Sequence, residues 1–189
     1  MDGLTLDSDC ILVGLDVEAL FMSIPHSIHK PITTHHNVIL QALNFVLYHN
    51  VFMVDGIHYL QKQGVAKCAP SYANLYLGGW ERHIFTSDDY DMYLGHINRW
   101  HRYIDDIMLI WQGPEHLLKE FVTKLNVNKF NLSFTMNYDS SKLEFLDIEI
   151  KKDSRGLVST NLFRKQTASN SLLHAKSIHP SKCVEGPIC

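Results

Sequence analysis

Two adjacent acids inside an otherwise apolar stretch place the strongest constraint on how this chain can fold. In the stretch RWHRYIDDIMLIWQG, runs of apolar and aromatic residues flank Asp105 and Asp106 on both sides. Polar residues between two strand-like runs are typical of a tight hairpin. The pattern therefore predicts two paired strands with both acids at the hairpin tip.

A second strand also ends on an acid. Residues 10–17, CILVGLDV, form a β-branched apolar run that indicates a buried strand closing at Asp16. Apolar spacing and turn residues predict further elements along the chain: helices over 33–50, 69–85 and 114–126, a hairpin over 52–60 around Asp55-Gly56, and strands over 132–138, 143–151 and 157–163. This order predicts an α+β domain with helices packed on one face of a largely antiparallel sheet.

Length and composition indicate one intracellular domain. A chain of 189 residues suffices for a single domain with a substantial core, and 46% hydrophobic and 20% charged residues are ordinary for such a domain. No apolar stretch approaches the roughly 20 residues that a membrane span needs, and the start lacks signal-peptide features. The four cysteines form no CxxC pair, which argues against a disulfide framework and a zinc ribbon. We expect a nuclear or cytoplasmic protein without membrane contact.

Charge is divided unevenly along the chain. Residues 1–112 hold 6 Lys/Arg against 12 Asp/Glu, a net charge of −6, whereas residues 113–189 hold 11 against 8, a net charge of +3. Seven of the basic residues lie within 151–182, Lys152 among them. An acidic half followed by a basic stretch suits an enzyme that holds phosphates between metal ions and cationic side chains. The alternative is that the basic stretch is a solvated face or a frayed tail.

Carboxylates at strand ends are suited to magnesium chemistry. Mg²⁺ prefers oxygen ligands and is usually held by one or two carboxylates plus substrate phosphates. Asp16 on one strand and Asp105 at a hairpin tip can meet over adjacent strands, as two-metal nucleotidyl transfer requires. The competing interpretation is a polar hairpin turn at Asp105-Asp106 and an unrelated strand end at Asp16.

Four ordered sequence blocks resemble reverse transcriptases. RYIDDIMLIW resembles their motif C, LDVEALFMSIPH resembles motif A, and GVAKCAPSYANLYLGGWE resembles motif B. LEFLDIEI and TNLFRKQTASNSLLHAKSIHP resemble the segments that follow the catalytic core in Penelope-like retroelement reverse transcriptases. The resemblance runs from about residue 10 to residue 182. It implies a polymerase palm-like fold and an RNA-directed DNA polymerase that uses two Mg²⁺ ions, with Mn²⁺ as a substitute.

The resemblance assigns roles to individual residues. It makes Asp16 and Asp105 the metal ligands, Asp106 the second acid of the catalytic pair, and Val17 a ligand through its backbone carbonyl. Phe21 matches the bulky residue that stacks under the sugar and rejects a 2′-hydroxyl group. The implied partners are an RNA template, a DNA primer and deoxynucleoside triphosphates.

Further residues are assigned to substrate contacts. Ser71 and Asn74 fall on the motif B helix, where the resemblance implies contact with the incoming nucleotide. The residues implied to contact nucleic acid are Tyr103, Arg164 and Lys165. Leu143–Ile150 matches the segment near the primer grip.

The chain also departs from the family. Its motif B is about three residues shorter than the pattern GTAMGAPFAPSYANL and lacks a glycine that lets backbone approach substrate. Residues 1–163 are expected to form the palm core without its fingers, and residues 164–189 the start of a connection toward a missing thumb.

Weak activity or none is therefore expected of the chain in isolation. The alternative is a degraded, non-catalytic retroelement fragment that at most binds nucleic acid. A different palm-type nucleotidyl transferase would explain the acids but not the other blocks. A zinc site formed by His174, His179, Cys183 and Cys189 is a further alternative to ordinary surface histidines.

Overall fold

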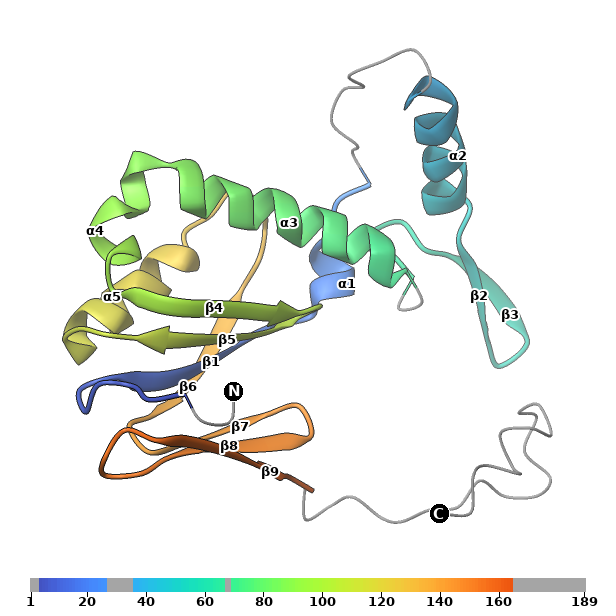
Figure 1. The fold of residues 1–189 in the computed structure, drawn as a ribbon. Helices are drawn as coiled ribbons and strands as arrows, with labels where there is room; N and C mark the ends of the chain where they lie inside the picture. Colours follow the sequence, from blue (N-terminus) through green and yellow to red (C-terminus); the bar gives the residue numbers. More distant parts are fainter. Residues whose placement is uncertain (1–3, 27–35, 67–68, 165–189) are drawn as a thin grey trace, which may run out of the picture.

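A four-stranded antiparallel sheet forms the centre of the protein (Figure 1). The structure is a computed structural model that describes residues 4–26, 36–66 and 69–164. The strands lie in the order β4-β5-β1-β6 and are β1 (Ile11–Val17), β4 (Ile97–Tyr103), β5 (Asp106–Trp111) and β6 (Phe134–Asp139). Side chains alternate between the two faces of a strand, so Leu15 points to one face while Asp16 points to the other.

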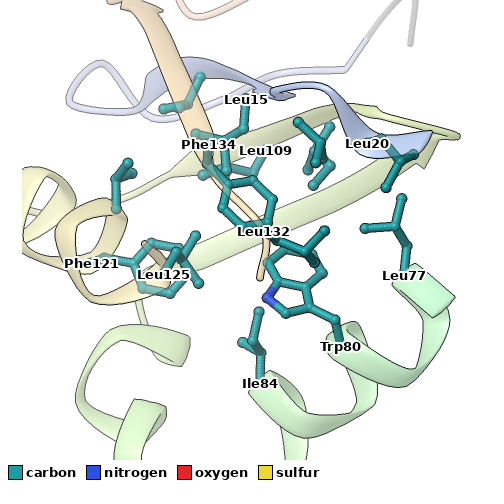
Figure 2. Packing of buried hydrophobic residues seen from close by; sticks show 14 of the residues in the cluster. Leu15, Leu20, Leu77, Trp80, Ile84, Leu109, Phe121, Leu125, Leu132 and Phe134 are labelled. Atoms are coloured by element: carbon teal, nitrogen blue, oxygen red, sulfur yellow. The ribbon is translucent and has the colours of Figure 1, made fainter. Parts of the chain in front are cut away.

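Helices cover one face of this sheet (Figure 1). They are α1 (Leu20–Ser23), α3 (Pro70–Thr86), the 3₁₀ helix η1 (Asp88–Tyr90), α4 (Asp91–Leu94) and α5 (Glu115–Leu125). The long helix α3 begins with a proline and buries Ala73, Leu77, Trp80 and Ile84, whose spacing makes one apolar stripe. Figure 2 shows this stripe against the sheet, where the rings of Trp80 and Phe134 stack 4.6 Å apart. Aromatic packing of this kind holds the helical layer to the strands.

A smaller three-stranded sheet packs under the opposite face. Its strands are β7 (Lys142–Phe145), β8 (Ile148–Lys152) and β9 (Val158–Leu162), in the order β7-β8-β9. Leu143 and Ile150 are register partners, and both are buried in a second core with Leu12 of β1. The predicted single strand over 143–151 is therefore wrong. Apolar residues occupy odd-numbered positions up to Phe145 and even-numbered positions from Leu146 onward. The change occurs because a two-residue turn at 146–147 reverses the chain between β7 and β8.

A helix and a hairpin lie beside the two sheets (Figure 1). They comprise α2 (His36–Tyr48), β2 (Val51–Val54) and β3 (Ile57–Leu60). Both residues of the connecting turn, Asp55 and Gly56, have positive φ angles of 51° and 78°, as a type I′ hairpin requires. The predicted hairpin is confirmed.

The α+β class, the antiparallel sheet and the helices on one face agree with the sequence prediction. The short elements α1, η1 and α4 were not predicted, because three or four residues are too few to show a helical period. Within the described ranges, no helix has the length and apolar character needed to cross a bilayer. The proposed zinc ligands at the C-terminal end lie outside the described residues.

Candidate active site

A row of four side chains crosses the central sheet on the face away from the helices. Register pairing joins Tyr103 of β4 to Asp106 of β5, Asp106 to Asp16 of β1, and Asp16 to Thr135 of β6. Directly opposed residues in a sheet point to the same face, with Cβ atoms about 4.5–5.5 Å apart. The separate strands that carry Asp16 and Asp106 thus bring these two acids side by side.

The hydrogen-bond pattern makes this pair especially close. The backbone N–H of Val17 donates to the carbonyl oxygen of Asp105 at 3.2 Å, which makes Val17 and Asp105 a hydrogen-bonded pair. Hydrogen-bonded and non-hydrogen-bonded pairs alternate along antiparallel strands, and the side chains are closer in the second kind. Asp16 and Asp106 are therefore a non-hydrogen-bonded pair. Two like charges in such a position are destabilising, so the site favours a bound cation.

The hairpin tip carries backbone strain. Ile104 and Asp105 form the two-residue loop between the paired residues Tyr103 and Asp106. Ile104 has a φ of 52°, which is costly for a β-branched residue. Its half-buried side chain packs against the main core, and this packing offsets part of the strain. Strained residues of this kind cluster at functional sites, and this one fixes the position of the adjacent Asp105.

A groove runs along the same face below the acids. A cavity of about 200 Å³ is lined by Asp16, Asp106 and Asn137 among others. A second cavity of about 540 Å³ shares Asp106 and Asn137 and continues toward Asp147 and Arg164. Gly14 lies beside Asp16 in the first cavity, where a Cβ atom would approach the Leu143 side chain to 3.4 Å. The groove thus joins the acid pair at one end to a cationic side chain at the other.

The acids fit a magnesium ion that is completed by substrate. Among the residues that the structure describes, no three His, Cys, Asp or Glu side chains are grouped as a metal site. Mg²⁺ is commonly bound by one or two carboxylates and takes its remaining ligands from water and substrate phosphates. A pair of opposed carboxylates beside an open groove meets that requirement. Asp105, which is partly buried at the hairpin tip, is adjacent to the pair in sequence.

The predicted nucleotide contacts lie toward the helical layer. Phe21 is half-buried in α1, packs against the main core, and accepts a hydrogen bond from the Val65 N–H through its carbonyl at 2.6 Å. Ser71 is exposed in the first turn of α3. The side-chain oxygen of Asn74 accepts a hydrogen bond from Arg102 at 2.8 Å. Their roles in binding a nucleotide stay predictions.

The predicted nucleic-acid contacts have different positions. Tyr103 is 59% exposed at the end of β4 and lies in the row with the acids. Arg164 is exposed and lines the groove. Lys165 lies outside the described residues.

One cation of the basic stretch does not face solvent. Lys152 is only 8% exposed and donates to the backbone carbonyls of Asp7, Ser8 and Cys10 at 3.4, 3.0 and 2.5 Å. The stretch therefore holds one phosphate-facing cation fewer than the charge count suggested. Buried cations need hydrogen-bond partners, and Lys152 finds them by fastening the segment that leads into β1.

Sequence reasoning missed the polar residues on the floor of the groove. Thr135 and Asn137 of β6 are register partners of Asp16 and Gly14. Thr135 and Asn137 are two residues apart in the predicted strand over 132–138, so they were expected on the same face of it. Only the pairing of β6 with β1 shows that this face is the one with the acids. Glu144 of β7 also lines the groove.

Comparisons with known proteins show the fold. The chain matches no protein-family model and no curated protein sequence. It is similar, with a TM-score of 0.51 and 10% identity over 77% of its length, to a chain from structures of the segmented genome and RNA polymerase complex inside a dsRNA virus. It also resembles apo telomerase from Candida tropicalis, truncated from its C-terminal domain, with a TM-score of 0.42, 10% identity and 81% coverage. The chain spans 16% and 35% of the lengths of these two chains. The protein thus has a palm-like α+β fold that is found in a polymerase complex.

Proposed function

We propose that this chain is the palm of a reverse transcriptase of the Penelope-like type, which extends a DNA primer on an RNA template with deoxynucleotides. The observation that carries the proposal is the side-by-side position of Asp16 and Asp106 next to a strained hairpin tip that holds Asp105. The palm-like fold and the sequence blocks around these acids support the same assignment. The likeness to a polymerase complex supports nucleic acid as the partner.

The carboxylates of Asp16, Asp105 and Asp106 would hold the divalent cations. When bound, such cations lower the pKa of the primer 3′-hydroxyl and stabilise the triphosphate and the leaving pyrophosphate. The protein contributes position: β1 and the β4–β5 hairpin fix the acids relative to one another, so little reorganisation is needed when substrate arrives. Repulsion between Asp16 and Asp106 favours cation binding.

Neighbouring residues would orient the substrates. The groove that leaves the acid pair has room for the primer end, and Arg164 at its far end attracts a phosphate. Phe21, held by its carbonyl and by core packing, would exclude a 2′-hydroxyl from the sugar position.

Primer extension tests the chemistry directly. The chain is incubated with an RNA template, a labelled DNA primer, deoxynucleotides and Mg²⁺, and compared with Asp16→Asn and Asp105→Asn. Both variants are expected to lose extension by two orders of magnitude or more, because each removes a cation ligand. Asp91→Asn, an exposed acid in the first turn of α4, is the matched control and is expected to extend normally. Equal extension by all four proteins would remove the assigned chemistry.

Cation binding provides a readout that does not depend on turnover. Titration of Mn²⁺ followed by electron paramagnetic resonance is expected to show binding to the wild type, reduced in Asp16→Asn and unchanged in Asp91→Asn. The second candidate, a non-catalytic descendant that only binds nucleic acid, is favoured by the shortened motif B, which lacks a glycine that lets backbone approach substrate. It predicts no difference in Mn²⁺ binding between Asp16→Asn and the wild type.

A further inference from the structure

A large cavity on the helical side of the sheet takes no part in the proposed chemistry. Its volume is about 1180 Å³. Its walls are the end of α1 with the residues that follow it, the end of α2, the segment after β3, the outer side of α3, and residues 129–131. The residues of α3 that line it are Leu75, Tyr76 and Gly79, in the first half and middle of the helix. The acids open onto the other face of the sheet, so this cavity is a separate place.

Three hydrogen bonds tie its walls together. The ring Nε2 of His26 contacts the carbonyl oxygen of Gly64 at 2.5 Å, and because a carbonyl only accepts, that nitrogen is the donor. The Asn131 amide donates to the Ser23 carbonyl at 3.3 Å. The Tyr76 hydroxyl donates to the carbonyl of residue 130 at 2.7 Å. A cavity braced in this way is preorganised, which lowers the entropy cost of binding a ligand.

Gly64 adds a steric brace. Its φ is 72°, and a Cβ atom at this position would lie 2.5 Å from the Phe21 carbonyl oxygen and 2.7 Å from the Met22 Cα. The segment after β3 therefore lies directly on the backbone of α1. Only glycine permits so close an approach.

The lining combines aromatic rings with cations. Tyr48, Tyr76 and Phe130 supply the rings, and Lys62 and Lys129 supply the charges. No Asp or Glu is among the described residues that line the cavity, although residues 1–112 have a net charge of −6. Neither lysine forms an ion pair with any residue in the described ranges. The cavity is thus a local positive region.

We propose that this cavity binds nucleotide units of a single-stranded nucleic acid. Sites for single strands combine a positively charged groove with rings on which bases stack, and apolar cavities with a few convergent polar groups are typical ligand sites. Lys62 and Lys129 attract phosphates, and the exposed ring of Tyr48 offers a stacking surface. This inference does not depend on polymerase activity.

Fluorescence anisotropy in EDTA tests the proposal without divalent cations. The probe is a 5′-labelled oligouridylate or oligothymidylate of about 12 nucleotides, within the site sizes of known single-strand binders. Lys62→Glu/Lys129→Glu is expected to weaken binding at least tenfold and to lower the slope of log K against log salt by about 1.4, since about 0.7 is lost per phosphate contact. Lys119→Glu/Lys151→Glu carries the same charge change at two exposed sites outside the cavity, and is expected to change affinity less than threefold.

Ring variants test the stacking. Tyr48→Ala is expected to weaken binding about tenfold, whereas Tyr48→Phe keeps the ring and the affinity. Unlabelled uridine triphosphate in EDTA identifies the source of the ligand. Displacement of the probe at low concentration means that free nucleotides use the cavity, and displacement by strands alone means a strand path. Either result supports a cavity that binds the base and the phosphates of a nucleotide unit.

Three results would overturn the proposal: no binding by the wild type, wild-type affinity in Lys62→Glu/Lys129→Glu, or an equal loss in the control pair. Circular dichroism confirms folding of each variant. The probe is measured in EDTA, where the acids hold no divalent cation, so failure of primer extension and failure of this site are distinguishable.

Discussion

Removing one charge of the opposed acid pair should stabilise the protein and weaken its response to divalent cations. In Asp106→Asn, the neutral amide faces Asp16 in place of a second carboxylate. At about 5 Å in a solvent-like dielectric, two like charges repel by about 0.8 kcal/mol, and directly opposed pairs in sheets contribute up to about 1 kcal/mol. A change of this size raises the Tm of a chain of 150–250 residues by about 2–4 °C.

Thermal unfolding in EDTA and in Mg²⁺ measures both effects. In EDTA, Asp106→Asn is expected to unfold about 2–4 °C above the wild type, with a smaller difference at high salt because exposed charges are screened. Mg²⁺ at ten times its Kd should stabilise the wild type by about 1.4 kcal/mol and stabilise the variant less. Asp91→Asn should respond to Mg²⁺ like the wild type. A variant that is less stable in EDTA, or that gains as much from Mg²⁺ as the wild type, would refute the reasoning.

Three further predictions concern the scaffold. Gly156→Ala should lower the free energy of unfolding, measured by chemical denaturation, by about 2–4 kcal/mol, because φ is 82° and the Cβ would overlap the Leu6 carbonyl oxygen. Gly95→Ala is the control, because its Cβ would meet nothing within 4 Å, and it should stay within about 1 kcal/mol of the wild type. Burial raises the pKa of the Cys10 thiol, so a thiol reagent at pH 8 should modify it far more slowly in the native protein than in denaturant, and equal rates would contradict this burial. Hydrogen bonds from the following turn lower the pKa of Asp139 below 3.8, so the stability that this carboxylate contributes is present above pH 3.8 and is lost as pH falls through the folded pKa. Asp139→Ala should therefore destabilise the protein at pH 7 and have almost no effect at pH 2. A loss of stability that does not depend on pH would contradict this linkage.

Sequence reasoning predicted the elements that carry long patterns. The helix over 69–85 and the hairpin around Asp105-Asp106 agree with α3 and the β4–β5 pair, because apolar periodicity marks the helix and the apolar runs on both sides of the acids mark the strands. The expectation that both acids lie at the hairpin tip is wrong for Asp106, which begins β5, whereas Asp105 lies in the turn. The split of 143–151 into β7 and β8 had a readable cue in the parity shift at Leu146, whose φ is 54°. A short element such as α1 has no such cue.

The site was predicted less completely than the fold. Local patterns in the sequence predicted that the acids lie near the ends of strands. The register that places Asp16 opposite Asp106, however, depends on the pairing of strands that are distant in sequence. Three-dimensional packing likewise buried Lys152, which a charge count treats as a surface cation. The cavity of about 1180 Å³ beside α1 is lined by residues of five separate segments and leaves no local pattern in the sequence.

Anomalous scattering from a crystal of the protein soaked in Mn²⁺ would locate the cation directly. The account predicts a peak at coordination distance from the carboxylate of Asp16 and from the carboxylate of Asp105 or Asp106, absent in a crystal of Asp16→Asn. A peak elsewhere on the protein, or none at these acids, would contradict the assignment of the β1 end and the β4–β5 hairpin as a catalytic centre.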